Sequence, residues 1–147
     1  MTYGLGDCII RAVSKASLFF IDGNGDNLIK KVNRKVKAFV LAAAKLADER
    51  RCTDIVALDM RKISQVTDYF LIITGTSDRQ MRSVADEITD LAKKNKSYLF
   101  GRAGYEQGRW VLLDFIDVVV HIFDDQSRGY YDLEMLWGDA KRLKIDK

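Results

Sequence analysis

The first residue that could do acid–base chemistry is His121, the single histidine of this 147-residue chain. It lies in the apolar run 118–123, where strand alternation places it on one face with Asp117, Val119 and Phe123. One histidine does not form a two-histidine zinc site, and neither cysteine is near it in the sequence. A Ser-His-Asp triad would need an activated serine, and the chain has no Gly-x-Ser-x-Gly elbow. The sequence favours a half-buried histidine, hydrogen-bonded to a carboxylate, over a catalytic one.

The second candidate is the turn 75–78, Gly-Thr-Ser-Asp, between an apolar run and a helical pattern. A helix N-terminus with small residues can hold an anion such as phosphate. One glycine without a following lysine is far from a P-loop, and no Gly-x-Gly-x-x-Gly follows a strand. We therefore expect a capping turn with Ser77 as the N-cap. A minimal nucleotidyltransferase-like enzyme that uses this corner is the alternative.

Paired carboxylates are the third candidate, because two-metal phosphoryl transfer uses acids that point the same way from one strand, at i and i+2. Asp114 and Asp117 are separated by a turn, and Asp124 and Asp125 are adjacent, so neither pair has this spacing. Turn formation and solvation explain them better. Residues 22–33 begin like a calcium loop but lack its glycine and its glutamate. We therefore predict no catalytic residue, no metal and no cofactor.

Aromatic side chains are concentrated in the last third of the chain, close to two arginines. Tyrosine, tryptophan and arginine dominate binding hot spots, but aromatic residues also fill cores. The sequence leaves core and interface open, and some residues can serve both. The residues concerned are Trp110, Phe123, Tyr130, Tyr131 and Trp137, with Arg109 and Arg128.

The bulk composition fits one globular domain. Hydrophobic residues make up 48% of the chain and charged residues 31%, which is ordinary for a soluble protein. No apolar run approaches the ~18 residues of a membrane span, and no secretory pattern opens the chain. Two cysteines, Cys8 and Cys52, are a poor disulfide framework. We therefore expect a cytoplasmic protein with reduced thiols and no membrane segment.

Charge is distributed unevenly along the chain. Residues 48–137 hold 12 Lys or Arg and 16 Asp or Glu, whereas residues 1–47 and 138–147 together hold 12 basic and 5 acidic residues. We therefore expect an acidic folded body with basic ends. An acidic body suits a basic protein partner better than nucleic acid, whose phosphates dominate affinity. The alternative is that the charge is spread for solubility alone.

The first elements expected are a helix and two strands. Asn33 has the character of a helix N-cap, and apolar residues then recur at i, i+3, i+4 and i+7. This helix should end near Arg50 and Arg51, where cations suit the helix dipole. Residues 55–58 are typical of a short buried strand. Residues 69–74 are too apolar for a strand that is exposed on either face.

The second half of the chain predicts a helix, a hairpin and a closing helix. A long amphipathic helix follows Ser77, and residues 98–100 suggest a short strand before a loop marked by glycines. Residues 110–113 and 118–123 predict a hairpin. Residues 130–137 predict a short helix before a charged, frayed tail.

The order of these elements predicts an α/β fold, a single domain with a mixed β-sheet flanked by helices. We place the domain at residues 33–140. It follows an N-terminal extension of unknown role at 1–32 and precedes a charged C-terminal tail at 141–147.

Short blocks between residues 35 and 140 match a known family in order and spacing. The blocks are Asp54–Asp59, Thr67–Ser77, Gln80, Ala85–Ile88, Gly108–Asp114, Asp117–Phe123, Arg128, Tyr130–Tyr131, Leu133–Glu134 and Leu136–Trp137. They resemble the ribosomal silencing factor family, also called RsfS or Iojap-like. Two departures concern turns. Ile116 stands where the family usually has glycine, and residues 106–108, Glu-Gln-Gly, replace its common Glu-Gly.

The resemblance implies a ribosome-binding protein without catalytic activity, on a nucleotidyltransferase-like fold that lacks the catalytic acids. Such proteins bind the large ribosomal subunit through ribosomal protein L-fourteen and sterically block association with the small subunit. This represses translation under nutrient limitation. Organelle relatives assist large-subunit assembly, and family members form homodimers. The alternatives are the minimal enzyme, an assembly role and a homodimeric scaffold, and neither a membrane nor sequence-specific nucleic acid is an expected partner.

The resemblance also implies two groups of site residues. The residues expected to bind the partner, or to support that surface directly, are Arg109, Trp110, Asp114, Asp117, His121, Phe123, Arg128, Tyr130, Tyr131, Leu136 and Trp137. The second group is expected to shape the corner between strand and helix. These residues are Asp68, Thr74, Gly75, Ser77 and Gln80.

Overall fold

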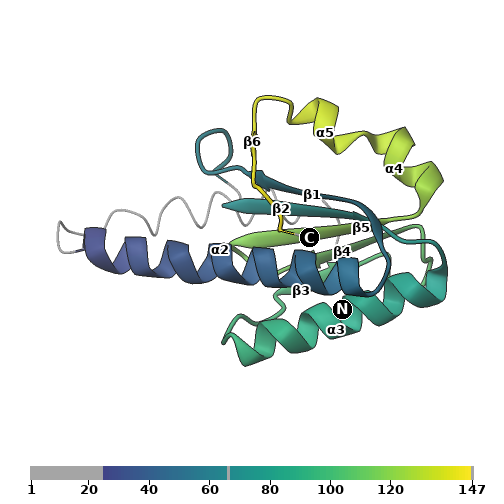
Figure 1. Cartoon of the computed structure of the whole chain (residues 1–147), viewed down its shortest axis with the longest axis horizontal. Helices are drawn as coiled ribbons and strands as arrows, with labels where there is room; N and C mark the ends of the chain where they lie inside the picture. The colour runs from purple at the N-terminus through teal and green to yellow at the C-terminus, as the bar shows by residue number, and fades with distance from the viewer. Residues whose placement is uncertain (1–24, 66, 147) are drawn as a thin grey trace.

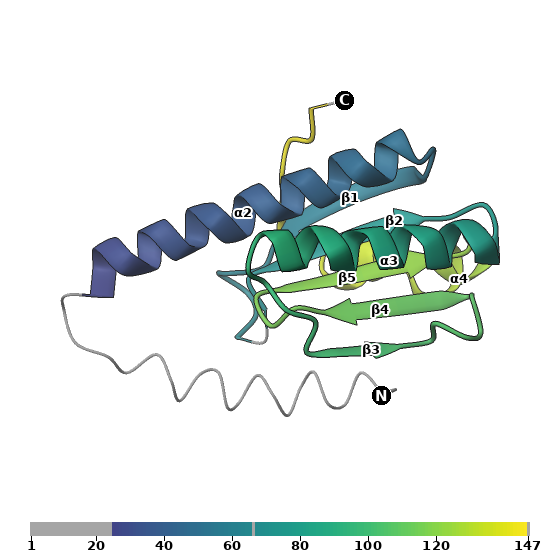
Figure 2. The ribbon, with the colours of Figure 1, turned by 90° about the horizontal axis from the view of Figure 1, so that it is seen from below.

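The structure, a computed structural model, describes residues 25–65 and 67–146, which form one open β-sheet with helices on both faces (Figure 1). Helices α2 and α3 cover one face, and the short helices α4 and α5 lie against the other (Figure 2). The sheet has six strands in the order β3-β4-β5-β2-β1-β6. The elements are α2 (Gly25–Glu49), β1 (Thr53–Asp59), β2 (Tyr69–Thr74), α3 (Asp78–Lys94), β3 (Gly101–Ala103), β4 (Trp110–Asp114), β5 (Val118–Phe123), α4 (Asp125–Tyr131), α5 (Leu133–Leu136) and β6 (Lys141–Arg142).

The centre of the sheet is a parallel pair, β2 with β5, whereas the other strand pairs are antiparallel. Both central strands are buried almost throughout, as their continuous apolar sequence predicts. The connection from β2 to β5 passes through α3 and then through the β3–β4 hairpin. A mixed sheet flanked by helices confirms the predicted fold class, and its likeness to nucleotidyltransferases stays a prediction.

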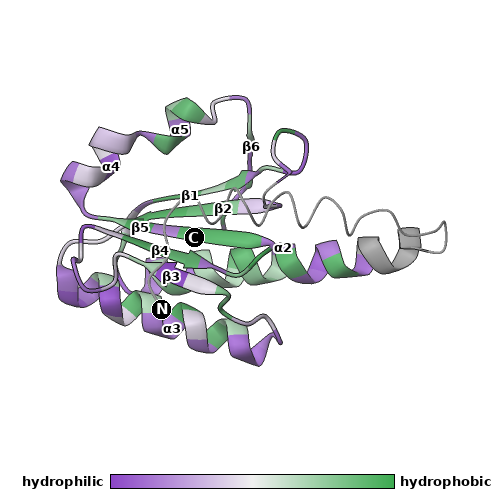
Figure 3. Cartoon of the chain, turned by 180° about the vertical axis from the view of Figure 1, so that it is seen from behind, coloured by the Kyte–Doolittle hydropathy of each residue, from purple (hydrophilic) through white to green (hydrophobic). Residues whose placement is uncertain are grey.

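The larger core lies between the sheet and helices α2 and α3. Helix α3 has an apolar side facing the sheet and a polar side facing solvent, and the strands are hydrophobic along most of their length (Figure 3). Its N-cap is Ser77, whose Oγ accepts a hydrogen bond from the backbone N–H of Gln80 at 3.2 Å, as predicted. The core side chains of α2 and α3 are Phe39, Val40, Ala43, Ala44, Ala47, Met81, Val84, Ala85, Ile88 and Ala92.

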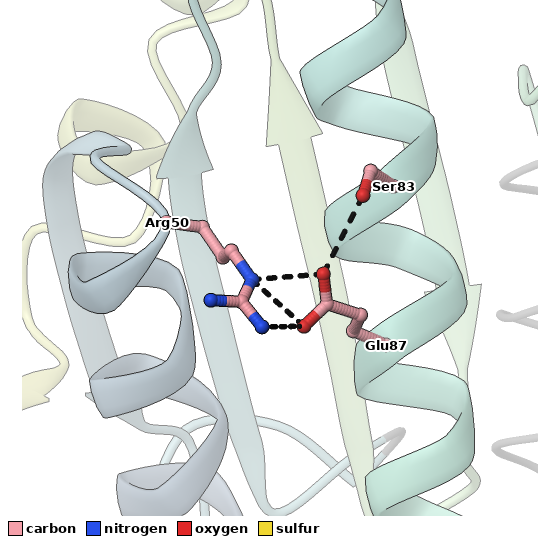
Figure 4. A network of polar contacts seen from close by, with 3 residues as sticks. All are labelled: Arg50, Ser83 and Glu87. Carbon is pink, nitrogen blue, oxygen red and sulfur yellow. Dashed lines mark hydrogen bonds and ion pairs between the residues drawn. The ribbon is translucent and has the colours of Figure 1, made fainter.

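An exposed ion pair joins the end of α2 to α3. The guanidinium of Arg50 lies 2.7 Å from the carboxylate of Glu87, and the hydroxyl of Ser83 donates to the same carboxylate (Figure 4). The Arg50 guanidinium holds the pKa of Glu87 below its ordinary value. Because the Arg50 side chain is half exposed, solvent screens the pair and it contributes little to stability. Burial in the core, rather than this pair, fixes the two helices.

Helix α2 begins earlier than the sequence pattern predicts. It starts at Gly25, so Asn33 lies inside the helix and its prediction as the N-cap is wrong. Asparagine acts as an N-cap only where its own backbone is not helical. Residues 25–33 contain no proline that would interrupt the helix before Asn33. The predicted C-terminal end is confirmed, because α2 ends at Glu49, next to Arg50. Within the described chain, no helix combines the length and apolar character needed to cross a membrane.

Four of the five predicted strands are confirmed, including 55–58 within β1, and one is wrong. Strand β2 has the predicted bounds, and the β4–β5 hairpin surrounds the predicted turn. The short strand lies at Gly101–Ala103 instead of residues 98–100. Phe100 donates its backbone N–H to the carbonyl of Asp114 at 2.8 Å, and the paired register runs from Gly101 to Ala103. Gly101 therefore belongs to a strand and not to the glycine-marked loop.

The C-terminal region also differs from the predicted single helix 130–137. The carboxylate of Asp124 caps α4 by accepting from the backbone N–H of Ser127, so α4 begins before Tyr130. Asp132 then adopts a left-handed conformation, with φ of 42°, and separates α4 from α5. The sequence did not predict this break, because position 132 holds neither glycine nor proline.

Residues 141–143 pair with the sheet, and the expectation of a frayed tail is wrong for them. Strand β6 pairs with β1, and the backbone N–H of Leu143 donates to the carbonyl of Ala57 at 2.8 Å. Leu143 and Ile145 pack against the larger core. These two apolar residues alternate with charged ones, which is a strand pattern that the high charge of the tail concealed.

Candidate partner-binding surface

The face of the sheet toward α4 and α5 carries a cluster of aromatic rings. Trp110 of β4 stacks on Phe123 of β5, with ring centroids 5.0 Å apart, and lies 4.5 Å from the ring of Tyr131. Phe70 of β2 lies edge-on to Trp137, with centroids 6.1 Å apart. The rings on the strands thus hold the two short helices against the sheet. The predicted aromatic residues therefore come together, and several of them serve the core.

His121 lies at the centre of this cluster. Its side chain is buried, with 2% exposed, and its Nδ1 accepts a hydrogen bond from the indole N–H of Trp110 at 3.1 Å. The expected half-buried histidine with a carboxylate partner is therefore wrong, since the partner is an indole. Burial, with a smaller effect from Arg128, lowers the pKa of His121 to about 3. The neutral ring supports the surface from below and has no access to a partner or substrate.

Arg128 fixes α4 to the sheet and to α5. Its side chain is buried, its Nη1 donates to the hydroxyl of Thr74 at 2.9 Å, and its Nε donates to the carboxylate of Glu134 at 2.6 Å. A charged group this well buried is retained only when its donors find partners. Arg128 therefore positions the two helices, and little of its side chain is exposed.

Four large side chains on α4 and α5 are exposed: Tyr130 at 82%, Tyr131 at 46%, Met135 at 80% and Leu136 at 68%. We call these four residues the α4–α5 patch. Exposed aromatic and large apolar side chains grouped in this way mark interaction sites. The sequence prediction missed Met135, although it is a large apolar residue directly before the predicted Leu136.

The acidic residues around the patch are exposed or half-buried. They are Asp124, Asp125, Asp132, Glu134 and Asp139. Arg109 is also exposed, and its carbonyl accepts the backbone N–H of Asp124 at 2.9 Å, so it lies beside the start of α4. The apolar patch is therefore bordered mainly by negative charge.

Asp114 and Asp117 shape the β4–β5 turn. The carboxylate of Asp114 is fully buried and accepts the backbone N–H of Ile116 at 2.8 Å, so the expected solvation of this group is wrong. Burial raises the pKa of Asp114 to about 6. Asp117 is half-buried, and its backbone carbonyl accepts the hydroxyl of Thr67 at 2.9 Å. Asp114 thus supports the surface from inside, and Asp117 faces a separate cavity at the other side of the sheet.

Of the second predicted group, Thr74, Gly75, Ser77 and Gln80 lie at the corner between β2 and α3, whereas the prediction is wrong for Asp68, which lies at the other end of β2. Gln80 joins this corner to the end of α2, because its amide donates to the carbonyl of Arg50 at 2.8 Å and accepts the backbone N–H of Thr76 at 2.6 Å. Gly75 is buried, and a Cβ at this position would overlap the side chain of Met81. Asp68 donates its backbone N–H to the carbonyl of Asp117 at the start of β2.

A cavity of about 550 Å³ beside this corner bears on the alternative of an enzyme. Its lining includes Asp78, Asp124 and Asp125, and contains no lysine or arginine among the described residues. Three carboxylates repel the phosphates of a nucleotide. In the described part of the chain, no group of three His, Cys, Asp or Glu side chains is arranged to hold a metal ion that would compensate.

The comparisons with known proteins agree with one another. The family model “Ribosomal silencing factor during starvation” matches residues 33–147. The chain belongs to the ribosomal silencing factor family. It is 47% identical over 110 residues to ribosomal silencing factor RsfS of Bacillus subtilis, covering 75% of this chain and 93% of that protein. It is 35% identical over 108 residues to the chloroplastic protein Iojap of Zea mays, covering 74% of this chain and 47% of that protein.

Solved structures show the same fold as this member of the ribosomal silencing factor family. A crystal structure from Bacillus halodurans has a TM-score of 0.61 at 39% identity and covers 70% of this chain and 93% of that chain. A crystal structure from Chromobacterium violaceum has a TM-score of 0.67 at 30% identity and covers 76% of this chain and 92% of that chain. The predicted family is thus confirmed, and the family is named for a regulatory activity, not a catalytic one.

Proposed function

We propose that this protein is a ribosomal silencing factor that binds the large ribosomal subunit through ribosomal protein L-fourteen. Bound there, it occupies the face at which the small subunit docks and so represses translation under nutrient limitation in the cytoplasm. The observation that carries this proposal is the α4–α5 patch, in which Tyr130, Met135 and Leu136 are each at least two-thirds exposed. Family membership supplies the ribosome as the partner.

The charge around the patch fits a basic protein. Asp125, Asp132 and Asp139 are exposed at its border, whereas Arg128 is buried and paired with Glu134. Opposite charge at the rim of an interface raises the association rate and selects the partner, while the apolar centre supplies most of the affinity. A specific interface buries about 800 Å² on each partner, which two short helices and their surroundings can provide.

The proposed mechanism is steric exclusion and needs no chemical step. The aromatic cluster and Arg128 hold α4 and α5 against the sheet before binding, so little conformational entropy is lost when the partner binds. A preorganised surface of this kind competes with the small subunit for one binding site. Homodimer formation through the same patch would block the proposed site, and a role in large-subunit assembly would use it equally.

The test uses purified large subunits and the complete chain. We expect the wild-type protein to sediment with the large subunit at moderate salt and to prevent the small subunit from joining it. Replacing Met135→Asp and Leu136→Asp together should abolish both effects, because two charges would be buried at the centre of the interface. The matched control is Ile63→Asp, another exposed apolar position outside the patch, which should leave both unchanged.

Three outcomes would overturn the proposal or redirect it. If subunits join equally well with and without the protein, steric exclusion is wrong. If the double variant still sediments with the large subunit, the α4–α5 patch is not the site. If sedimentation velocity shows a dimer that the double variant abolishes while subunit binding persists, the patch serves the homodimer instead.

A further inference from the structure

A second charged surface lies on the opposite face of the sheet. A cavity of about 490 Å³ is lined by residues of α2, the end of α3 and the β4–β5 turn. Three lysines line it, Lys35 from α2 and Lys94 and Lys96 from the end of α3. These elements are distant in the sequence but lie side by side in space (Figure 2). We call this site the lysine cavity.

The positive charge at this site is not neutralised by neighbours. None of Lys35, Lys94 and Lys96 forms an ion pair with another described residue, and all three are exposed. Among the described lining residues, the only carboxylate is that of Asp117. Lys31 extends the positive surface, because it precedes Lys35 by one helical turn and is also exposed. A cluster of three or more cations around a hollow attracts polyanions.

Exposed aromatic rings follow the lysines directly. Tyr98 is 68% exposed and Phe100 is 57% exposed, in the segment Lys-Lys-Asn-Lys-Ser-Tyr-Leu-Phe at residues 93–100. Lysines bind phosphates, and exposed rings stack on unpaired bases, so this combination is typical of surfaces that bind single-stranded nucleic acid. An acidic peptide would use the lysines and leave both rings without a role.

We propose that the lysine cavity, with Tyr98 beside it, binds the backbone and an unstacked base of single-stranded or looped RNA without reading its sequence. This goes beyond the proposed function, in which a protein is the partner and the α4–α5 patch is the site. The two surfaces have opposite charge, and ribosomal surfaces consist of RNA phosphates and basic proteins. Opposite charges therefore assign the RNA to the lysine cavity and the basic protein to the α4–α5 patch.

The experiment measures binding of the complete chain to a fluorescently labelled single-stranded RNA of about 12 nucleotides, by anisotropy over a series of salt concentrations. The triple variant Lys35→Ala, Lys94→Ala and Lys96→Ala should lower the slope of log affinity against log salt by about 2, because each phosphate contact contributes about 0.7. The matched control, Lys45→Ala with Lys62→Ala and Lys144→Ala, removes the same charge from exposed positions outside the cavity. It should leave the slope unchanged.

A second pair of variants tests stacking. Tyr98→Ala should weaken RNA binding about tenfold, and Tyr98→Phe should restore it, because stacking needs the ring and not the hydroxyl. A footprint on the wild-type protein keeps the test independent of variant folding. RNA should protect Lys35, Lys94 and Lys96 from acetylation and leave Lys45 reactive.

Each opposite result would overturn the inference. No binding of the RNA at low salt, or equal losses in the two triple variants, would show that the cavity is not an RNA site. Binding of an oligoglutamate peptide with the same lysine dependence, but not of RNA, would assign the cavity to an acidic protein. Free RNA replaces the ribosome in these measurements, so the double variant in the α4–α5 patch should still bind RNA. Failure of one proposal therefore leaves the other intact.

Discussion

The two faces of the sheet bury different kinds of side chains. The core under α2 and α3 consists of aliphatic, aromatic and small residues. The buried set toward α4 and α5 also includes Thr74, His121, Arg128 and, by strand alternation, Asp114. Buried polar groups reduce stability unless they are paired, and proteins retain such groups mainly at functional sites. One face therefore stabilises the fold, while the other positions the proposed binding surface.

The greatest loss of stability is expected from a substitution in the core under α2 and α3. Ile88→Ala, at a side chain with no exposed surface, should lower the free energy of unfolding by about 4 kcal/mol, because it leaves a cavity in the core. Leu136→Ala, at a side chain that is 68% exposed, should change that free energy by less than about 0.5 kcal/mol. Urea unfolding measures both. Equal losses in the two variants would contradict the division of roles.

The next effect concerns the buried carboxylate on the other face. Burial raises the pKa of Asp114 from 3.8 to about 6, so the folded state prefers its protonated form. The stability of the wild type, relative to Asp114→Asn, is therefore highest below about pH 4 and falls as the pH rises through about 6. The change should reach at most about 3 kcal/mol, as a shift of this size implies. Urea unfolding at both ends of this range measures it, and a constant difference would show that Asp114 is not desolvated.

A smaller effect should appear in binding. Trp137→Ala should weaken binding to the large subunit by about 2 kcal/mol if the indole anchors the interface. Phe70 would also lose its edge-on contact with this ring, so unfolding must be measured alongside. Ile63→Ala, at an exposed apolar position outside the α4–α5 patch, is the control. Unchanged affinity for the subunit would remove Trp137 from the proposed site.

The smallest change in the free energy of unfolding is expected for a substitution in the β4–β5 turn. Ile116 has φ of 73°, a left-handed conformation that a β-branched side chain adopts only with strain. Ile116→Gly should therefore raise the free energy of unfolding by about 1 kcal/mol, or the melting temperature by about 3 °C. Ile116→Ala keeps a Cβ and should gain less. If glycine destabilises the protein instead, the contacts of the isoleucine outweigh the strain in its backbone.

Local interactions could be predicted from the sequence, whereas interactions between distant residues could not. Ser77 was predictable as a cap because its interaction with Gln80 is local and depends on residue type. The partner of His121 was not predictable, because Trp110 reaches it from the neighbouring strand. The split at Asp132 was missed because aspartate carries only a weak signal for the left-handed conformation. The expected acidic body was wrong, since the folded part 25–146 holds 21 Lys or Arg and 19 Asp or Glu once α2 and β6 are included.

The fold class, the central strands, helix α3 and the family could all be predicted from the sequence, because side-chain periodicity and residue blocks are local properties of the chain. Which predicted site residues are exposed became clear only from the packing of the elements. It buried Asp114, His121 and Arg128, exposed Met135 and Leu136, and brought Lys35 beside Lys94. The physical reason is that burial depends on which element covers which face, and that depends on contacts between residues far apart in the chain.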